Sequence, residues 1–325
     1  MKTVLDMTYA SGFTFDLFLR RRLHPYYSNL LRNLITDKEF APMPLSSLPE
    51  TGSFSMVTDV PDYLDVSLKM ESNQLKTKKV KQYQGFLCDL SDCETALDYM
   101  STKFSKKSIK NIRAKKRQLE TQYNIVYKNH YGEIDREHYD FLFDRFYDLL
   151  KKRFDEKKIQ NRYLLVWKTY HELVYPMILR KEASLFAIYD GEEPIALALD
   201  FYVEDISFGY IQVFDAEYQK YYMGDVFMME RLDWLLSHTF KIFDFLMGET
   251  YYKIKWSNHS YTYHHQLFYK PNSLMGNLKM QYVKAKLQFK QYLRDKGILG
   301  KLFSMDRLLY RRMSKKLKGY DWKNP

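Results

Sequence analysis

Four residues whose side chains can hold or move a proton lie close together in the chain: Asp244, Glu249, Tyr252 and Lys253. A carboxylate can orient or deprotonate an amine, and Asp244 is the first candidate for that role, with Glu249 second. Tyr252 and Lys253 can donate hydrogen bonds to a carbonyl oxygen or a phosphate. Two plainer interpretations stay open: Asp244 caps the following turn, or Tyr252 and Lys253 form a surface pair at a strand end.

A second stretch combines residue types that favour an anion. Its candidate ligand-binding residues are Gln212, Val213, Phe214, Gln219, Lys220, Met223, Gly224 and Asp225. A strand should end at Phe214 and a helix should begin near Gly224, where free N–H groups and the helix dipole attract negative charge. Glycine permits close approach of the backbone, and Lys220 adds charge. The plainer interpretation is an ordinary turn before a core helix.

Other reactive residue types predict less. Cys88 and Cys93 match no common zinc spacing. His259, His264 and His265 would need further ligands to hold a metal ion, and none is evident. We therefore expect no metal site.

The elements that would position these residues follow from hydrophobic periodicity. Apolar residues at helical spacing predict a helix over residues 135–154, with Asp135 as its N-cap, and a further helix over 168–181. Residues 184–189, 194–203 and 206–214 predict three antiparallel strands, followed by a helix and a fourth strand over 241–248. Residues 251–257 are expected to be extended. This order favours an α/β (α+β) fold with helices packed on a mostly antiparallel sheet.

Positive charge is concentrated in one place. The net charge is +11, and residues 103–117 contain eight Lys or Arg and no acid. Nucleic acid, an anionic membrane surface or a polyphosphate cofactor could each explain such an excess. A solvated helix face is the plainer explanation.

Four segments resemble the CelD-like branch of the GNAT acyltransferase superfamily, which is associated with bacterial cell-surface polysaccharides. KFSKKSIKNIRAKKRQLE resembles its opening helix, ASLFAIYDGEEPIALALDFY its first hairpin, FDAEYQKYYMGDVFMMERLDWL its strand-to-helix crossover, and DFLMGETYYKIKW its closing signature. FemAB-type aminoacyltransferases are similar, and in that wider group two GNAT-like lobes lie in tandem. The glycine spacing departs from the usual phosphate-loop pattern, because Val226 stands where a second glycine or alanine belongs.

The resemblance implies an N-acyltransferase that transfers an acyl group from acetyl-CoA or another acyl-CoA to an amine. The acceptor would be a small molecule or a saccharide. Two alternatives stay open: an aminoacyl-tRNA donor, or a non-catalytic envelope scaffold. DNA is not an expected partner, and tRNA is expected only with the first alternative.

We expect three regions: residues 1–100 as a lobe with a reduced GNAT-like fold, 101–275 as the acyltransferase domain, and 276–325 as a basic helical tail. No apolar run approaches the ~18 residues of a spanning helix, and the first residues lack the apolar centre of a signal peptide. The expected location is cytoplasmic, with the tail in peripheral contact with the inner membrane.

Overall fold

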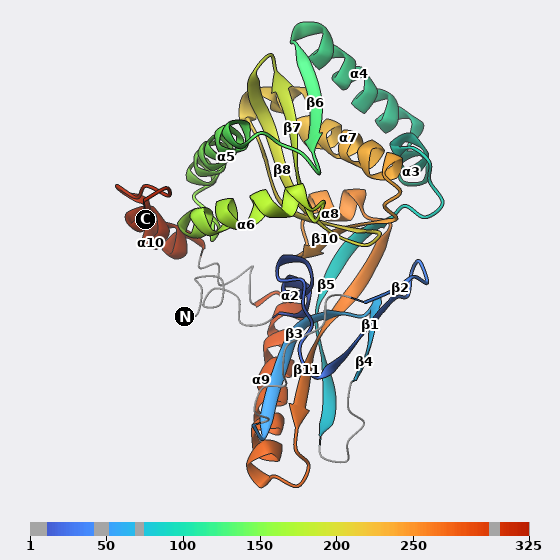
Figure 1. The fold of residues 1–325 in the computed structure, drawn as a ribbon, viewed down its shortest axis with the longest axis vertical. Coiled ribbons are helices and arrows are strands. Elements are labelled where there is room, and N and C mark those ends of the chain that lie inside the picture. Colours follow the sequence, from blue (N-terminus) through green and yellow to red (C-terminus); the bar gives the residue numbers. More distant parts are fainter. Residues whose placement is uncertain (1–11, 42–51, 69–74, 299–305, 325) are drawn as a thin grey trace. The chain divides into compact units, whose positions relative to one another are not determined.

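The computed structural model describes residues 12–41, 52–68, 75–298 and 306–324 (Figure 1). The chain divides into two compact units, each built from segments distant in sequence. Unit 1 comprises residues 1–89 and 244–304, and unit 2 comprises residues 90–243 and 305–325. Strand β10 (Ile242–Met247) spans the point at which the chain passes from unit 2 back to unit 1.

Unit 2 contains an antiparallel sheet in the order β6-β7-β8-β9. Its strands are β6 (Ile125–His130), β7 (Ala183–Asp190), β8 (Glu193–Val203) and β9 (Ile206–Phe214). Strands β7 and β8 are joined by the tight turn at Gly191 and Glu192, and Gly191 adopts the left-handed conformation that glycine allows. The three strands predicted over residues 184–214 are thereby confirmed.

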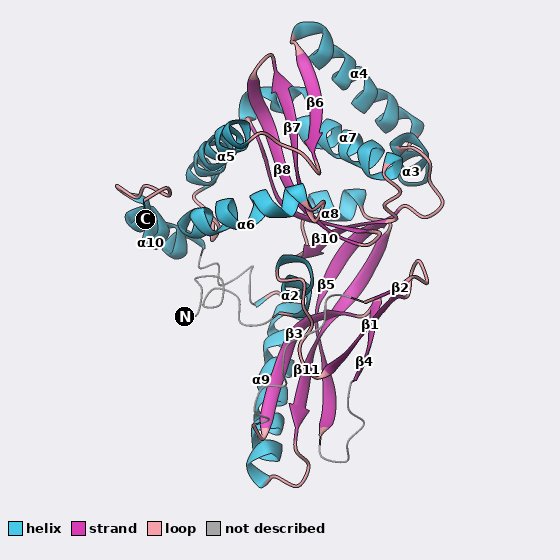
Figure 2. Ribbon diagram, in the orientation of Figure 1, coloured by secondary structure: helices cyan, strands magenta, loops and turns pink. Residues whose placement is uncertain are grey.

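Helices cover both faces of this sheet (Figure 2). They are α3 (Ala96–Lys103), α4 (Lys106–Gln122), α5 (Arg136–Lys157), α6 (Trp167–Leu179) and α7 (Met223–Ser237). One core cluster joins Leu119 of α4 and Phe227 of α7 to Phe186 and Ile188 of β7. Helices α5 and α6 contact β7, β8 and β9 from the other face. The nearly continuous apolar runs of β7 and β8 follow from burial on both faces.

Unit 1 contains an antiparallel sheet in the order β3-β11-β5, with a smaller sheet in the order β2-β1-β4. The first sheet is formed by β3 (Phe54–Pro61), β5 (Lys76–Asp89) and β11 (His259–Tyr269), and the second by β1 (Tyr27–Asn33), β2 (Glu39–Phe40) and β4 (Leu64–Leu68). Helices α2 (Phe13–Leu19), α8 (Tyr251–Trp256) and α9 (Leu274–Asp295) complete the described part of this unit.

The structure confirms a mixed α/β fold with mostly antiparallel sheets flanked by helices. Helix α5 begins after Asp135, whose carboxylate accepts hydrogen bonds from the amides of Glu137 and His138. The expectation of an extended segment after residue 250 was wrong. There the Thr250 hydroxyl accepts a hydrogen bond from the Lys253 amide and caps the short helix α8.

The predicted regions do not coincide with the two units. The expected boundaries near residues 100 and 275 differ from the changes of unit at residues 89–90, 243–244 and 304–305. Part of the predicted tail, residues 299–305, lies outside the described residues. The rest forms the end of α9 and helix α10 (Asp306–Leu317), which belongs to unit 2.

Candidate functional site

Asp244 lies at the centre of a buried polar cluster in unit 1. Its side chain has no exposed surface, and both carboxylate oxygens accept hydrogen bonds. The Tyr63 hydroxyl donates to Oδ2 at 2.7 Å, and the Tyr261 hydroxyl lies 2.7 and 2.8 Å from Oδ1 and Oδ2. The backbone amide of Leu246 donates to Oδ1 at 2.7 Å. Asp244 therefore does cap the following turn, through the Leu246 amide. Its other hydrogen bonds come from the two tyrosine hydroxyls.

A glycine makes room for this cluster. Tyr261 lies on β11 opposite Gly85 of β5, and a Cβ atom at Gly85 would collide with the Tyr261 ring. A glycine inside a strand often marks such a close approach. Tyr263 lies two residues further along β11, and its hydroxyl is 2.7 Å from that of Tyr261. Gly85 thus lets an aromatic ring cross the strand and reach the carboxylate.

Burial shifts the pKa values of the ionisable groups in this cluster. Desolvation raises the pKa of Asp244 to about 6, although hydrogen bonds from Tyr261, Tyr63 and the Leu246 amide and the charge of Lys253 oppose the shift. Desolvation lowers the pKa of Lys253 to about 8, against the attraction of Asp244. The pKa of Tyr261 is raised well above its ordinary value by burial and by the nearby Asp244 charge. At neutral pH the cluster therefore holds a carboxylate and an ammonium group that both change charge within about a unit of pH 7.

Lys253 belongs to the same structural feature as Asp244. Its ammonium group donates to the backbone carbonyls of Met247 at 2.6 Å and Leu246 at 3.4 Å. Leu246 has a φ of 61°, a conformation uncommon for any residue but glycine. Asp244 holds the amide of Leu246 and Lys253 holds its carbonyl, so the pair fixes the strained end of β10. Lys253 is not the surface residue of the plainer interpretation.

Tyr252 and Glu249, the other two residues predicted to hold or move a proton, lie at the edge of this cluster. Tyr252 is half-buried, and its ring contacts Phe245 edge-to-face with centroids 5.9 Å apart. Glu249 is exposed just after β10. Of the two carboxylates, Glu249 has the solvent access that direct proton transfer needs, whereas Asp244 reaches its surroundings through hydroxyl groups.

The predicted anion-binding stretch lies in unit 2. Strand β9 ends at Phe214, a 3-10 turn η2 (Ala216–Tyr221) follows, and α7 begins at Met223. Tyr222, between them, has a φ of 55°, and its carbonyl accepts the amides of Asp225 and Val226. Gly224 lies in the first turn of α7, where an added Cβ would come no closer than 3.7 Å to Phe214.

The candidate side chains of this stretch have different environments. Met223 is fully buried in the core cluster with Phe227, and Val213 is 4% exposed, so neither side chain is available to a ligand. Gln219 and Lys220 are exposed, and the Lys220 ammonium group lies 5.0 Å from the Tyr221 ring centroid. The ring of Phe214 lies 5.3 Å from the Arg153 guanidinium. Asp225 places an acidic side chain in the first turn of α7.

Gln212 accepts a hydrogen bond from the arginine of a buried ion pair. Arg231 of α7 donates to both carboxylate oxygens of Asp200 on β8, and its Nη1 donates to Gln212 Oε1 at 2.7 Å. Arg231 and Asp200 are each 2% exposed. Two strands and α7 are thereby linked through one guanidinium group. The Gln212 side-chain oxygen is thus occupied by Arg231, and its binding to a cofactor stays a prediction.

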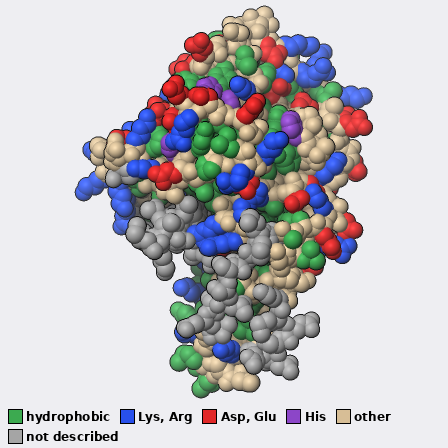
Figure 3. Space-filling model, viewed as in Figure 1, with side chains coloured by type: hydrophobic (Ala, Val, Ile, Leu, Met, Phe, Trp, Pro, Cys, Tyr) green, Lys and Arg blue, Asp and Glu red, His purple; other side chains and the backbone are tan. Residues whose placement is uncertain are grey.

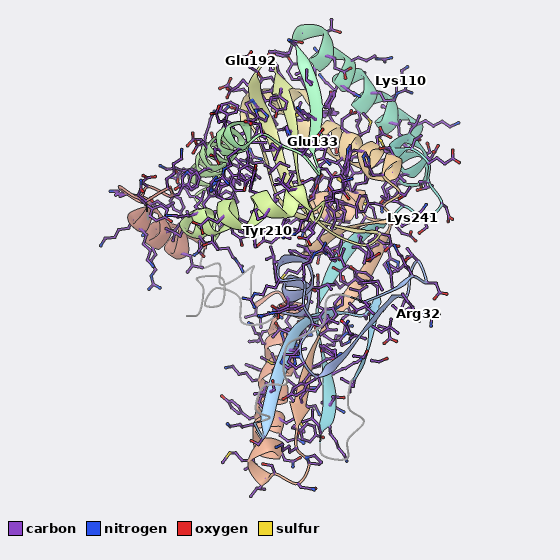
Figure 4. All side chains as sticks on the ribbon, in the orientation of Figure 1. Arg32, Lys110, Glu133, Glu192, Tyr210 and Lys241 are labelled. Carbon is purple, nitrogen blue, oxygen red and sulfur yellow. The ribbon has the colours of Figure 1, made fainter. Side chains whose placement is uncertain are left out.

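A β-bulge interrupts the pairing of β8 with β9. The register changes between Leu199, which faces Ile211, and Asp200, which faces Gly209, so Tyr210 is the extra residue. Bulges re-aim side chains and free backbone groups. The hydroxyl of Tyr210, which is labelled in Figure 4, lies 2.6 Å from that of Tyr170 on α6.

Tyr63, Gly85 and Tyr261 were not among the predicted site residues. The one local signal is Gly85, a glycine inside the strand-like run KQYQGFLCDL. Tyr63 lies 181 residues from Asp244 in the chain, and the residues next to Tyr63 in the sequence do not indicate this contact. Asp244 and Lys253 belong to unit 1, and Gln219 and Gly224 belong to unit 2. Among the described residues, no group of three or more His, Cys, Asp or Glu side chains is arranged to hold a metal ion.

Residues 106–254, from α4 to α8, match the family model described as an acetyltransferase (GNAT) domain. The matched residues are thus similar to a GNAT-type acetyltransferase domain. No curated protein matches the sequence.

Several solved structures are similar to this chain at low identity. FemX is 12% identical over 63% of this chain and 68% of its own, with a TM-score of 0.44. The C-terminal domain (DUF2156) of a putative lysylphosphatidylglycerol synthetase from Agrobacterium fabrum is 10% identical over 65% and 66%, with a TM-score of 0.44. A conserved protein of unknown function from Bacteroides thetaiotaomicron is 9% identical over 60% and 62%, with a TM-score of 0.41. The chain spans between 62% and 68% of the length of these structures.

Proposed function

We propose that this protein is an acyltransferase that moves an acyl group from acyl-CoA to an amine. The observation that carries the proposal is the match of residues 106–254 to the GNAT acetyltransferase domain. The matched residues include the antiparallel strands β6 to β9, the bulge at Tyr210 and the passage through η2 into α7. These are the parts that would bind a thioester along a strand and an anion at a helix N-terminus.

The N-terminus of α7 is the proposed pyrophosphate site. The nearest atom to a Cβ at Gly224 would be that of Phe214 at 3.7 Å, and Lys220 is exposed on the preceding turn. The helix dipole and Lys220 both favour a negatively charged group there. Met223, Val213 and Gln212 contribute through their backbone, because their side chains are engaged elsewhere.

The chemistry requires a neutral amine and a place for its proton. The amine nitrogen attacks the thioester carbon, the new N–C bond forms, the C–S bond breaks, and the leaving thiolate takes up a proton. We assign the acceptor side to Asp244, Glu249, Tyr252 and Lys253. Lys253 suits the proton transfer because its pKa of about 8 leaves both protonation states populated near neutral pH. Asp244 acts by holding Tyr63 and Tyr261 in place and by attracting the Lys253 charge.

The acceptor that we propose is an amino sugar used in cell-surface polysaccharide synthesis. This part of the proposal rests on the resemblance of the sequence to the CelD-like branch, and it assigns the reaction to the cytoplasm. A saccharide amine is neutral only in part at pH 7, which is why a group able to accept its proton is needed.

An aminoacyl-tRNA donor is the second candidate. Two observations favour it: Asp225 puts a carboxylate in the first turn of α7, and Tyr222, rather than a glycine, takes the left-handed conformation before that helix. An acid at this point opposes binding of a pyrophosphate. If the protein is a non-catalytic scaffold, it should bind neither acyl-CoA nor aminoacyl-tRNA.

Calorimetry with acetyl-CoA separates these functions. We expect the unmutated protein to bind acetyl-CoA. Gly224→Leu should bind it at least about tenfold more weakly because the side chain obstructs the approach of the pyrophosphate to the backbone, and Lys220→Gln about threefold more weakly. Lys151→Gln, an exposed lysine on α5, is the matched control and should bind as the unmutated protein does. Failure of the unmutated protein to bind acetyl-CoA, with binding of an aminoacyl-tRNA, would replace the first proposal by the second.

A further inference from the structure

Helix α9 has two apolar faces, and the protein covers one of them. Met280, Val283 and Leu287 pack against Val80 of β5 and Leu267 of β11. The other face carries a second apolar row, here called the α9 stripe. It consists of Met275, Leu278, Tyr282, Ala285, Phe289 and Tyr292.

The α9 stripe is continuous and exposed. Its members alternate at intervals of three and four residues, so they lie along one line on the helix. Leu278 is 57% exposed, Tyr282 69% and Phe289 62%. Single apolar residues at a surface need no explanation, but a contiguous row of large apolar side chains marks a surface that contacts another apolar phase.

Cations border the α9 stripe along one edge of the helix. Lys279 and Lys286 each follow a stripe residue directly, and both are exposed. Long lysine side chains beside an apolar surface can bury their methylene groups and keep the ammonium group at the polar boundary.

The other edge opens into a groove of about 1670 Å³ between α9, β5 and the segment around α8. Six cations line this groove: Lys78, Lys79, Lys81, Lys284, Arg294 and Lys296. Two acids, Glu249 and Asp295, line it as well. Figure 3 shows hydrophobic and basic side chains together at the surface along the part of unit 1 where α9 runs in Figure 1.

We propose that the α9 stripe and its bordering cations form a docking surface for an anionic lipid bilayer. A helix with an apolar row that contains Leu and Phe, flanked by lysines, lies in the plane of the membrane interface. The excess of cations on both edges complements anionic headgroups, each nearby Lys or Arg adding to the attraction. The contact is peripheral, because no helix among the described residues is both long and apolar enough to cross a bilayer.

A second copy of this chain fits the same surface less well. Two α9 helices packed antiparallel would bring the edge carrying Lys279 and Lys286 of one copy against the same edge of the other, and like charges repel. The stripe also alternates large rings with Ala285, whereas helix pairs favour branched aliphatic residues at these positions. A fluid bilayer accepts the irregular outline of the stripe.

This assignment differs from the expected role of the C-terminal tail. In the described part of that tail, Met313 is 2% exposed and Leu317 6% exposed, and both are packed within unit 2. Their side chains are therefore not available to a bilayer, while those of the α9 stripe are.

Vesicle flotation of the full-length protein tests the proposal. We expect binding to phosphatidylcholine vesicles that contain phosphatidylglycerol, weak binding to phosphatidylcholine alone, and weaker binding at high salt. Leu278→Gln with Phe289→Gln should reduce the partition coefficient at least about tenfold, since two apolar side chains no longer enter the bilayer. Lys279→Gln with Lys286→Gln should reduce it about tenfold at low salt and flatten its salt dependence.

The matched control is Phe141→Gln with Leu179→Gln. These apolar residues of unit 2 are exposed to a similar degree, 43% and 45%, and their replacement should leave flotation unchanged. Thermal unfolding should show that all the variants fold, since each altered side chain is exposed.

Four results would overturn the proposal. One is absence of flotation with anionic vesicles, and another is equal loss of flotation in the control variant. The third is a dimer, seen by light scattering, that Leu278→Gln with Phe289→Gln dissociates, which would make the surface an interface between two copies. The fourth is binding of tRNA in place of vesicles, lost in the lysine variant, which would make it a nucleic-acid surface.

Discussion

Asp244 shows how one carboxylate can be kept in an interior without a full counter-charge. Its two oxygens accept hydrogen bonds from two tyrosine hydroxyls and one backbone amide. The positive charge of Lys253, at the same end of β10, also favours the ionised carboxylate. These contacts offset part of the desolvation cost but leave the pKa raised to about 6. The free energy of unfolding should therefore depend on pH through this carboxyl group.

The pH dependence of unfolding should change in Asp244→Asn. The folded pKa of about 6 exceeds the ordinary value of 3.8, so the folded state binds more protons between these pH values. This stabilisation is full below about pH 4 and is lost as the pH rises through about 6, and it amounts to about 3 kcal/mol at ~1.4 kcal/mol per pKa unit. Urea unfolding from pH 4 to 8 should show that component in the unmutated protein and not in Asp244→Asn. Asp65→Asn, at an exposed position of unit 1, should retain it; parallel profiles for the unmutated protein and Asp244→Asn would contradict the assignment.

Gly85 should be intolerant of even a methyl group. Gly85→Ala places Cβ on the Tyr261 ring, and overpacking of this kind costs about 1–3 kcal/mol. The cost should vanish when Tyr261 is itself replaced by Ala, because the colliding ring is then absent. Thermal unfolding of the two single variants and the double variant measures this coupling. Gly224→Ala, where the nearest atom would be 3.7 Å from the new Cβ, is the control that should unfold normally; equal costs of Gly85→Ala in both backgrounds would show that Tyr261 is not the reason.

At the scale of elements, periodicity predicted what depends on neighbouring residues. Helix α5 and its Asp135 cap follow from the spacing of its apolar residues and one local hydrogen-bond acceptor. Helix α8 was missed because its lysines alternate with large apolar or aromatic residues, a pattern typical of a strand. The Thr250 cap and the burial of Trp256 favour the helix. The contact of Tyr63 with Asp244 was beyond prediction, since it depends on the pairing of β3 with β11 across the sheet.

The ion pair of Asp200 with Arg231 should be costly to break and cheap to replace. Arg231→Met leaves a buried carboxylate without its partner, and we expect a loss of about 3–5 kcal/mol. Asp200→Leu combined with Arg231→Met removes both charges and should recover most of that loss. Urea unfolding of the single and double variants measures the difference. A double variant no more stable than Arg231→Met alone would mean that the pair contributes through packing, for example of the guanidinium against Phe243, 4.7 Å away.

At the scale of the whole molecule, each unit is assembled from two separate segments of the chain. Unit 2 takes its last segment from residues 305–325, although the rest of it ends at residue 243. The residues after α10 contact α5 and the 3-10 turn before α6. The Lys323 ammonium group donates to Asp144 of α5 at 2.7 Å, and the Tyr320 hydroxyl donates to the Leu165 carbonyl of that turn at 3.0 Å. The ring of Trp322 contacts Tyr147 and His171. This segment therefore closes the α5 and α6 side of unit 2.

Removal of residues 305–325 should lower the melting temperature of the protein and leave its vesicle binding unchanged. Three large side chains, Met313, Leu317 and Trp322, are between 2% and 7% exposed, and truncation would leave their partners on unit 2 uncovered. Met313→Ala with Leu317→Ala should destabilise in the same direction by several kcal/mol, at about 2–5 kcal/mol for each large-to-small change. Arg311→Gln with Arg312→Gln, two exposed positions on α10, is the control and should unfold normally. Calorimetric scanning and vesicle flotation of the same samples give both quantities. Loss of flotation at an unchanged melting temperature would return the lipid contact to the tail and remove it from α9.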